Sequence, residues 1–369
     1  MFMASFKFIN RVYLLFFLLL TITVLPSCYS VRQASHQLGL FLEAEDLTEY
    51  KKRPDADPAI LSKLSYLTEV LSYAEAAGLP SDGSYQSIIF PKGGVVSYLA
   101  IVAPKDQLSV KTHWFPFVGT VPYLGFFSKE ERDEYLYRMK ENGYDTHASV
   151  AGAFSLLGYF DDPLFSSMLK RSEENFAALF FHELVHKRIW ISSNAQFNER
   201  LAEFISIKLT KSFLKGSGRW EALENYSAQI DDKKKFNTWF RDLRSKLEVF
   251  YKDHSYEEAD FLQKRESIFR GAELRAPNFR AYNYVGNKPW NNARVAITST
   301  YGTDYSDFES AFGCLKETYK KHDTVTHLVS LFLEQLESYV KNTESEDLLG
   351  QFCRRQKVPK TESHSFLVR

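Results

Sequence analysis

The sequence has 369 residues with 46 basic and 46 acidic side chains, which gives a formal net charge of +0 at pH 7. Proteins that bind nucleic acids usually carry a basic excess, so this balance argues against a nucleic-acid partner. A hydrophobic content of 44% and an aromatic content of 15% are sufficient for a large packed core. The length allows one large domain or two lobes.

Residues 1–27 have the features of a targeting segment. Lys7 and Arg11 form a basic region before a mostly apolar run from Val12 to Leu25. This run is too short to cross a membrane comfortably. Leu25-Pro26-Ser27-Cys28 then resembles a lipobox, although Pro26 is unusual there, and it predicts Cys28 as the lipid-modified first residue of the mature chain. The alternative is ordinary secretion with cleavage nearby.

A lipid on Cys28 would anchor the protein to a membrane of the cell envelope. Tyr29 rather than Asp follows this cysteine, which favours the periplasmic face of the outer membrane if the host has two membranes. No later segment has 18 consecutive apolar residues, so we expect no other membrane span.

The mature chain, residues 28–369, is expected to form one domain. Residues 29–80 have helical periodicity and end at Gly78-Leu79-Pro80. Residues 82–126 are rich in β-branched and aromatic residues interrupted by Pro and Gly, which predicts strands. Ser128 with Glu131 begins a helix that Gly143 ends, and Thr146 to Phe160 is a further strand candidate. These elements define a strand-containing lobe over about 82–165.

The next segment carries the most informative motif, His182-Glu183-Leu184-Val185-His186. On a helix, residues i and i+4 lie on the same face, so both imidazoles can reach one metal ion. Glu183 lies beside them, where it could take a proton from a water activated by the metal. Apolar residues before the motif, after the acidic start Ser172-Glu173-Glu174, predict a largely buried helix. Two buried histidines beside a Glu would be costly without a partner such as a metal.

A second helix is predicted to follow after a short polar connection, Ile191 to Gln196. Short connections join antiparallel neighbours, which places Glu199 opposite His186. Glu199 is therefore the predicted third zinc ligand. Glu203, one turn later, is the alternative ligand, or an acceptor for an imidazole N–H, or a surface charge.

The remaining chain is predicted to be a helical lobe over about 166–358. An apolar stripe from Phe236 to Tyr251 has helical spacing and is expected in the core. Lys233-Lys234-Lys235 before it is interpreted as a solvated helix start. Pro277 to Thr300 is predicted to be irregular. Cys314 and Cys353 could form a disulfide in an oxidising compartment or remain as two buried thiols.

His182-Glu183-x-x-His186 followed by Asn198-Glu199-x-x-Ala202 resembles the gluzincin metallopeptidases, although the gap between the two motifs is shorter than in their best-known members. More closely, the chain resembles a bacterial family of predicted aminopeptidases that are often lipoproteins. The segments that carry this resemblance are Trp114–Gly119, Tyr123–Phe127, Ala153–Leu164, the zinc motif, Phe197–Glu199 and Asn291–Arg294.

The resemblance implies an α+β, mostly helical fold of zincin-like type, with a small antiparallel sheet beside the motif helix. It implies a Zn²⁺ cofactor and a peptide substrate, whose backbone would pair with an edge strand within 146–160. The alternative for that region is an internal strand in which Gly152 marks a bulge.

A zinc peptidase also needs a donor for the oxyanion and, if it is an aminopeptidase, an acid for the substrate ammonium. The resemblance favours a downstream Tyr as the donor, and Tyr301 is the first choice. The other candidates are Tyr282, Tyr284 and Arg294. The acids that could receive the ammonium are Asp161, Asp162 and Glu203.

Two other functions remain open. One is a non-catalytic envelope lipoprotein with a structural zinc site, and the other is a zinc-free receptor. Glu183 argues against the first because a structural site needs ligands but no general base. Unexplained buried histidines argue against the second. His113, His147 and His254 have no metal-ligand spacing and are interpreted as surface or structural residues. Sequence gives no oligomeric state.

Overall fold

The computed structural model describes residues 42–115, 119–151, 161–281, 283–286, 288–300, 305–319 and 324–342. The chain divides into two compact units, residues 1–44 and 45–369, and every element named below belongs to the second. Cys28, Tyr282, Tyr301 and Cys353 lie outside the described residues, as do residues 152–160 of the predicted substrate edge.

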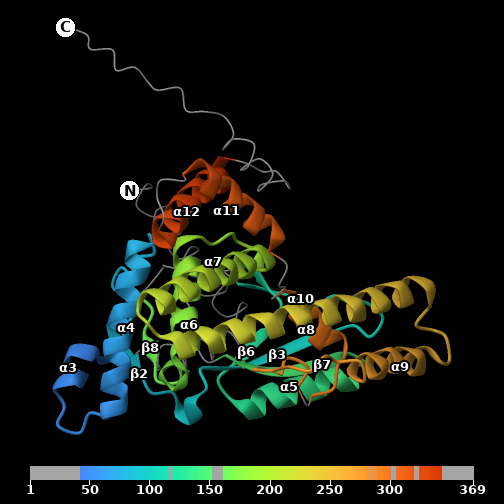
Figure 1. Cartoon of the computed structure of the whole chain (residues 1–369). Helices are drawn as coiled ribbons and strands as arrows, with labels where there is room; N and C mark the ends of the chain where they lie inside the picture. Colours follow the sequence, from blue (N-terminus) through green and yellow to red (C-terminus); the bar gives the residue numbers. More distant parts are fainter. Residues whose placement is uncertain are drawn as a thin grey trace, which may run out of the picture. The chain divides into compact units, whose positions relative to one another are not determined.

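The second unit is mostly helical with small sheets, which confirms the α+β class (Figure 1). The helices are α3 (Leu47–Lys52), α4 (Pro58–Ala76), α5 (Lys129–Glu141), α6 (Glu173–Arg188), α7 (Ala195–Gly216), α8 (Trp220–Asp253), α9 (Phe261–Glu273), α10 (Asn292–Thr300), α11 (Ser306–Thr318) and α12 (Val325–Asn342). The strands are β1 (Glu45–Asp46), β2 (Ser87–Ile89), β3 (Ser97–Ala103), β4 (His113–Phe115), β5 (Gly119–Val121), β6 (Leu124–Phe126), β7 (Asp145–Ala151) and β8 (Leu164–Phe165).

The sheet β6-β3-β7 is antiparallel, and β7 is one of its two edges in the described part of the chain. The second half of β3, Ala100 to Ala103, is buried without alternation, as expected for a strand that is covered on both faces. Ile101 and Ala103 pack against Ala293 of α10 on one face, whereas α5 covers the other (Figure 1). Two smaller sheets, β1-β2-β8 and β4-β5, complete the strand region.

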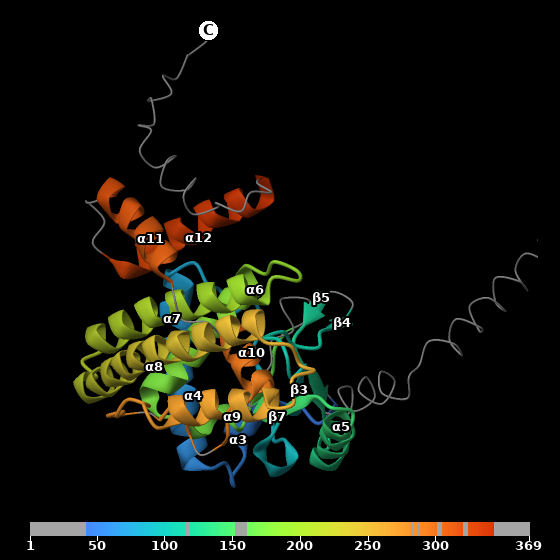
Figure 2. The same ribbon diagram turned by 90° about the vertical axis from the view of Figure 1, so that its right-hand side faces the viewer.

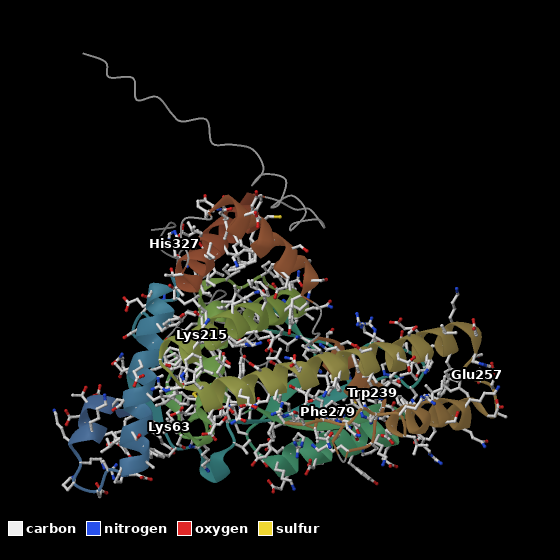
Figure 3. All side chains as sticks on the ribbon, in the orientation of Figure 1. Lys63, Lys215, Trp239, Glu257, Phe279 and His327 are labelled. Atoms are coloured by element: carbon white, nitrogen blue, oxygen red, sulfur yellow. The ribbon has the colours of Figure 1, made fainter. Side chains whose placement is uncertain are left out.

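Helix α6 is packed among α4, α7 and α8, and its residues from Glu174 to Arg188 are all buried or half-buried. Phe176, Phe180 and Phe181 are fully buried along it. This packing surrounds the polar residues of the motif with buried apolar side chains. The predicted stripe on α8 is also confirmed, because Phe236, Phe240, Leu243 and Leu247 are buried. Figure 3 shows Trp239 and Phe279, which belong to the same cluster, on the side of α8 that faces α9.

The hairpin α11–α12 lies against α4 and α7, and it is seen from a second side in Figure 2. Ion pairs join it to both helices of the motif region: Arg188 of α6 binds Glu337 at 2.8 Å, and Arg200 of α7 binds Asp307. Cys314 on α11 is disulfide-bonded, while Cys353 lies outside the described residues. Within the described ranges, no helix is both long and apolar enough to cross a membrane.

The prediction of irregular structure over Pro277 to Thr300 was partly wrong. Residues Asn292–Thr300 form α10. Asn291 is its N-cap, because the side-chain oxygen accepts a hydrogen bond from the Arg294 N–H at 3.0 Å. Asn292 then donates to the carbonyl oxygens of Pro104 and Gln107 at 2.9 and 3.1 Å, which ties α10 to the end of β3. The Asn291–Arg294 motif therefore organises the sheet rather than a reaction centre.

Candidate metal centre

The α6–α7 hairpin brings the two halves of the candidate site together. Helix α6 ends at Arg188 and α7 begins at Ala195, so the connection is Ile189–Asn194. Asn194 caps α7 by accepting from Phe197 N–H at 3.2 Å. Asn198 holds the connection itself, donating to the Ile191 carbonyl at 2.8 Å and accepting from the Ile191 N–H at 2.9 Å. Its neighbour Glu199 is thereby fixed on the face of α7 that meets α6.

Three side chains converge across this hairpin, His182, His186 and Glu199. The two Nε2 atoms lie 3.0 Å apart. One carboxylate oxygen of Glu199 is 3.3 Å from His182 Nε2, and the other is 3.6 Å from His186 Nε2. All three ligand atoms lie within 4.8 Å of one another. The exposed fractions of the side chains are 20%, 6% and 18%, so the cluster is recessed but reachable from one side.

The electrostatics of the cluster fit a cation. Burial lowers the pKa of His186 to about 3, and the charge of His182 adds to the effect, so His186 is neutral. Its Nδ1 is buried and has no hydrogen-bond partner. Burial would also lower the pKa of His182, but the hydrogen bond and charge of Glu199 outweigh it and raise that pKa. Two imidazoles and a carboxylate are a donor set that Zn²⁺ prefers, so these residues fit the metal.

Glu183 is not part of this ligand cluster, but it lies beside it on α6. Burial raises its pKa to about 7; the charge of His182 opposes this shift, whereas the charges of Glu199 and Asp162 add to it. A carboxylate with a pKa near neutrality can accept a proton and return it at physiological pH.

A turn that sequence reasoning missed packs against α6. Tyr85 is buried, and its ring meets Phe180 edge-on at 4.8 Å. Burial raises the pKa of Tyr85 well above its ordinary value, and the charges of Glu183 and Asp162 contribute. The backbone is strained here, with positive φ of 45° at Asp82 and 63° at Tyr85. Strain of this kind gathers at functional sites and persists when neighbours enforce it.

Lys187, the residue after the motif, enforces that turn. Its ammonium donates to the carbonyl oxygens of Ser81 and Asp82 and, at 2.9 Å, to Ser84 Oγ. The Ser84 hydroxyl accepts from Asp162 N–H at 3.0 Å. Lys187 thus connects α6 to the turn and, through Ser84, to the backbone of Asp162. The feature of the sequence that could have indicated this role is a lysine directly after the zinc motif, near the end of a largely buried helix.

The three acids proposed for the substrate ammonium lie in different surroundings. Asp161 is 66% exposed, with its carboxylate 3.9 Å from Lys187 Nζ. Asp162 is 3% exposed, and its charge acts on Glu183. Glu203 accepts from Lys233 Nζ at 2.6 Å, and its charge acts on His182.

Two of the candidate oxyanion donors have structural roles instead. The Tyr284 hydroxyl donates to the Gln229 carbonyl at 3.2 Å, and its ring packs on the α8 core. Arg294 donates to the carbonyl oxygens of Val285 and Lys288 and stacks on Trp290 at 4.0 Å. The polar groups of both side chains are therefore engaged in contacts that hold the fold. Tyr301 and Tyr282 fall outside the described residues.

Two backbone carbonyl oxygens on the edge of β7 already accept hydrogen bonds from side chains. Asn291 Nδ2 donates to the Thr146 carbonyl at 2.9 Å, and Lys288 Nζ donates to the Ala148 carbonyl at 3.1 Å. A substrate strand could not use these two acceptors without displacing them. Val150, at the other end of the strand, is 54% exposed.

The other histidines are not near a second metal ligand set in the described residues. His254 binds Glu258 at 2.9 Å, and His147 lies on β7 near Arg294 and Lys288. His113 lies on β4.

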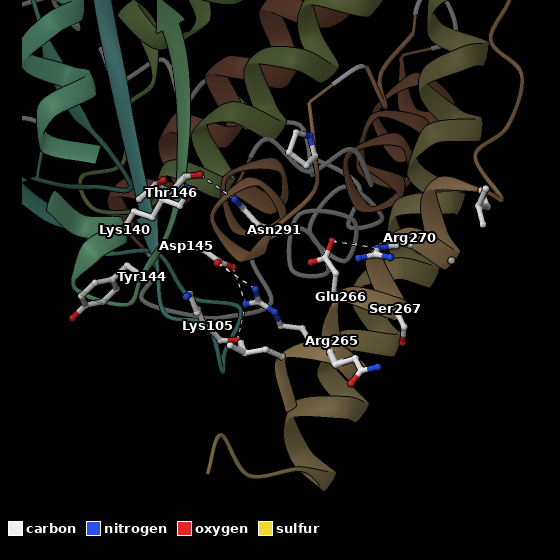
Figure 4. A pocket seen from close by; sticks show the side chains of 15 residues that line it. Lys105, Lys140, Tyr144, Asp145, Thr146, Arg265, Glu266, Ser267, Arg270 and Asn291 are labelled. Carbon is white, nitrogen blue, oxygen red and sulfur yellow. Dashed lines mark hydrogen bonds and ion pairs between the residues drawn. The ribbon is translucent and has the colours of Figure 1, made fainter. Parts of the chain in front are cut away.

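An open cavity of about 990 Å³ lies elsewhere, between β7 and α9 (Figure 4). Its floor is the buried pair Arg265–Asp145 at 2.8 Å, and its lining includes none of the residues of the metal cluster.

Comparison with known proteins supplies one match. A family model described as "Putative aminopeptidase" matches residues 28–338, which is most of the chain. Searches of curated proteins and of solved structures gave no match. The matched range spans the positions of His182, Glu183, His186 and Glu199. The chain belongs to this aminopeptidase family.

Proposed function

We propose that the protein is a zinc-dependent aminopeptidase of zincin-like type. The observation that carries this is the convergence of two histidine Nε2 atoms and the Glu199 carboxylate, with Glu183 adjacent. His182, His186 and Glu199 would hold the ion. Zinc bound there would polarise a substrate carbonyl and make a water molecule more acidic.

The protein's own residues would handle the proton. Glu183 takes one proton from the attacking water as its oxygen bonds to the carbonyl carbon of the peptide. It then delivers that proton to the departing nitrogen as the C–N bond breaks, which gives a carboxylate and a free amine. The pKa of about 7 suits both halves of this exchange. Lys187 fixes the turn that carries Tyr85, whose pKa is raised in part by the charge of Glu183.

We further propose that Asp162 receives the substrate ammonium. Asp161 faces solvent and Lys187, and Glu203 is neutralised by Lys233. Asp162 is favoured because its charge contributes to the raised pKa of Glu183. An ammonium there would place the first peptide bond beside the general base.

Aminoacyl amides and their N-acetylated forms test this role. Asp162→Asn should raise KM for the free-amine substrates about tenfold or more, since it removes a charge-assisted contact. Asp161→Asn, one residue away, is the matched control and should leave KM near the wild-type value. Equal hydrolysis of free and acetylated substrates by the wild type would instead indicate an endopeptidase.

The second candidate is a lipoprotein with a structural zinc. Glu203 favours it, because a second carboxylate one turn from Glu199 could complete the set as its fourth ligand. In either case we propose anchoring through a lipid on Cys28 in the cell envelope, on the periplasmic face of the outer membrane if the host has one.

A further inference from the structure

Glu203 decides which type of zinc site the hairpin can form. It lies four residues after Glu199 on α7, so both carboxylates lie on the same face of the helix. Structural zinc sites usually have four protein ligands, whereas catalytic sites have three. The site is therefore catalytic in type only if Glu203 stays out of the ligand set.

Lys233 of α8 binds Glu203. Its Nζ lies 2.6 Å from Glu203 Oε1, and the two side chains are 19% and 25% exposed. The next residue, Lys234, forms a different kind of pair with Asp231, at 3.1 Å with 69% and 66% exposure. Water screens an exposed pair strongly and a recessed one much less. Lys233 is thus a defined partner of Glu203, whereas Lys234 lies on the solvated face.

The rest of α8 supports the same contact. Tyr226 lies seven residues before Lys233, and therefore on the same helix face. Its phenol is buried, and the charge of Glu203 adds to the effect of burial in raising its pKa. Of these two residues, Lys233 is the one whose polar atom lies within hydrogen-bond distance of the Glu203 carboxylate.

We propose that Lys233 keeps Glu203 out of the metal's ligand set, so that the ion is held by His182, His186 and Glu199 alone. This inference rests on the proposed zinc site. Without the ammonium, Glu203 would be an uncompensated carboxylate beside Glu199, and a divalent cation would be its nearest available partner. Lys233 acts through Glu203 and is a positioning residue.

The full-length chain and three variants test this. Lys233→Met removes the charge, Lys234→Met is the matched control on the adjacent position, and Lys233→Met with Glu203→Ala removes the competing ligand. Two binding measurements are made on each: the Kd of zinc, by competition with a chromophoric chelator, and the Kd of acetohydroxamic acid for the zinc-loaded protein. The absorption spectrum of the cobalt-substituted protein reports the number of ligands.

Lys233→Met should bind zinc more tightly than the wild type. It should bind acetohydroxamic acid about tenfold more weakly or worse, because a fourth protein ligand occupies the position that the probe needs. Its cobalt spectrum should change, and the added Glu203→Ala should restore both the spectrum and the probe affinity. Lys234→Met should match the wild type throughout. Lys233→Arg should do so too, since it keeps the charge.

Wild-type probe affinity and an unchanged cobalt spectrum in Lys233→Met would overturn the inference, and so would weaker zinc binding. If Lys233→Met does not fold, Lys233→Gln removes the charge but keeps a donor, and the same outcomes apply. A wild-type protein that binds no zinc would instead reject the proposed function, and this inference with it. The two failures are therefore distinguishable.

Discussion

The Asn198 side chain binds both peptide groups of Ile191, with its amide nitrogen 2.8 Å from the carbonyl oxygen and its own oxygen 2.9 Å from the N–H. Asn198 is 1% exposed and stands next to Glu199. A backbone held at both of its polar groups cannot rotate freely, so this contact fixes the turn between α6 and α7. Through that turn it fixes the carboxylate that faces His182.

Asn198→Ala should weaken both the fold and metal binding. It leaves two backbone groups of Ile191 without partners, which should cost about 2–3 kcal/mol of the free energy of unfolding. Displacement of Glu199 should weaken zinc binding about tenfold. Denaturant unfolding of the metal-free protein and chelator competition measure the two effects separately. A stable variant with wild-type zinc affinity would show that the turn does not depend on the contact between Asn198 and Ile191.

Glu183→Gln should separate metal binding from turnover. The amide keeps the shape of the side chain but cannot accept the proton, so hydrolysis of aminoacyl amides should fall about a hundredfold or more. Zinc content should stay at the wild-type value, because Glu183 lies outside the ligand cluster. Equal rates for the variant and the wild type would exclude Glu183 as the general base.

His147 should make stability depend on pH. Burial, together with the charges of Arg294 and Lys288, lowers its pKa from 6.5 to about 4. Between these values the unfolded chain binds a proton that the folded protein does not, so stability falls as pH decreases from 6.5 towards 4. The metal-free wild type should therefore lose about 1–2 kcal/mol more than His147→Gln between pH 7.5 and pH 5. Parallel pH profiles for the two proteins would refute this.

Cys28→Ser should release the protein from the membrane fraction or block its maturation. Without the thiol no lipid can be attached, and the described helices include no membrane span. Ser30→Ala is the control, since it leaves the predicted lipobox intact. Cell fractionation measures the outcome, and a mature N-terminus other than residue 28 in mass spectrometry would contradict it.

The core of the candidate site was predictable because it is local in the sequence. His182 and His186 share a helix face by periodicity alone, and a short connection was enough to place Glu199 opposite them. The start of α5 at Ser128 was predictable for the same reason, since the side chain accepts from Glu131 N–H at 3.3 Å.

The surroundings of the site could not be predicted, because they depend on contacts between distant residues. Lys187 reaches Ser84, and Lys288 reaches the Ala148 carbonyl, across more than a hundred positions of sequence in each case. No local pattern records such pairs. The β7 edge looked free from its sequence, yet two side chains from the segment before α10 occupy its acceptors.

The segment Lys233-Lys234-Lys235 shows why a prediction from neighbouring residues alone can fail. The prediction of a solvated helix start was wrong, since α8 begins at Trp220 and the three lysines lie within it. Lys233 and Lys234 are identical residues in one basic run, but the geometry of the helix points their side chains about 100° apart. One then meets Glu203 and the other meets solvent. The apolar stripe that begins at Phe236 has clear helical spacing, but it covers only the second half of α8.

The zinc content of the purified protein tests the account most directly. Metal analysis of the wild type should give one zinc per chain, and His186→Ala should give almost none, because it removes a ligand from a three-residue set. Glu183→Gln, measured in parallel, should keep the full amount. A wild type without zinc, or full occupancy in His186→Ala, would contradict the metal centre on which the proposed function rests.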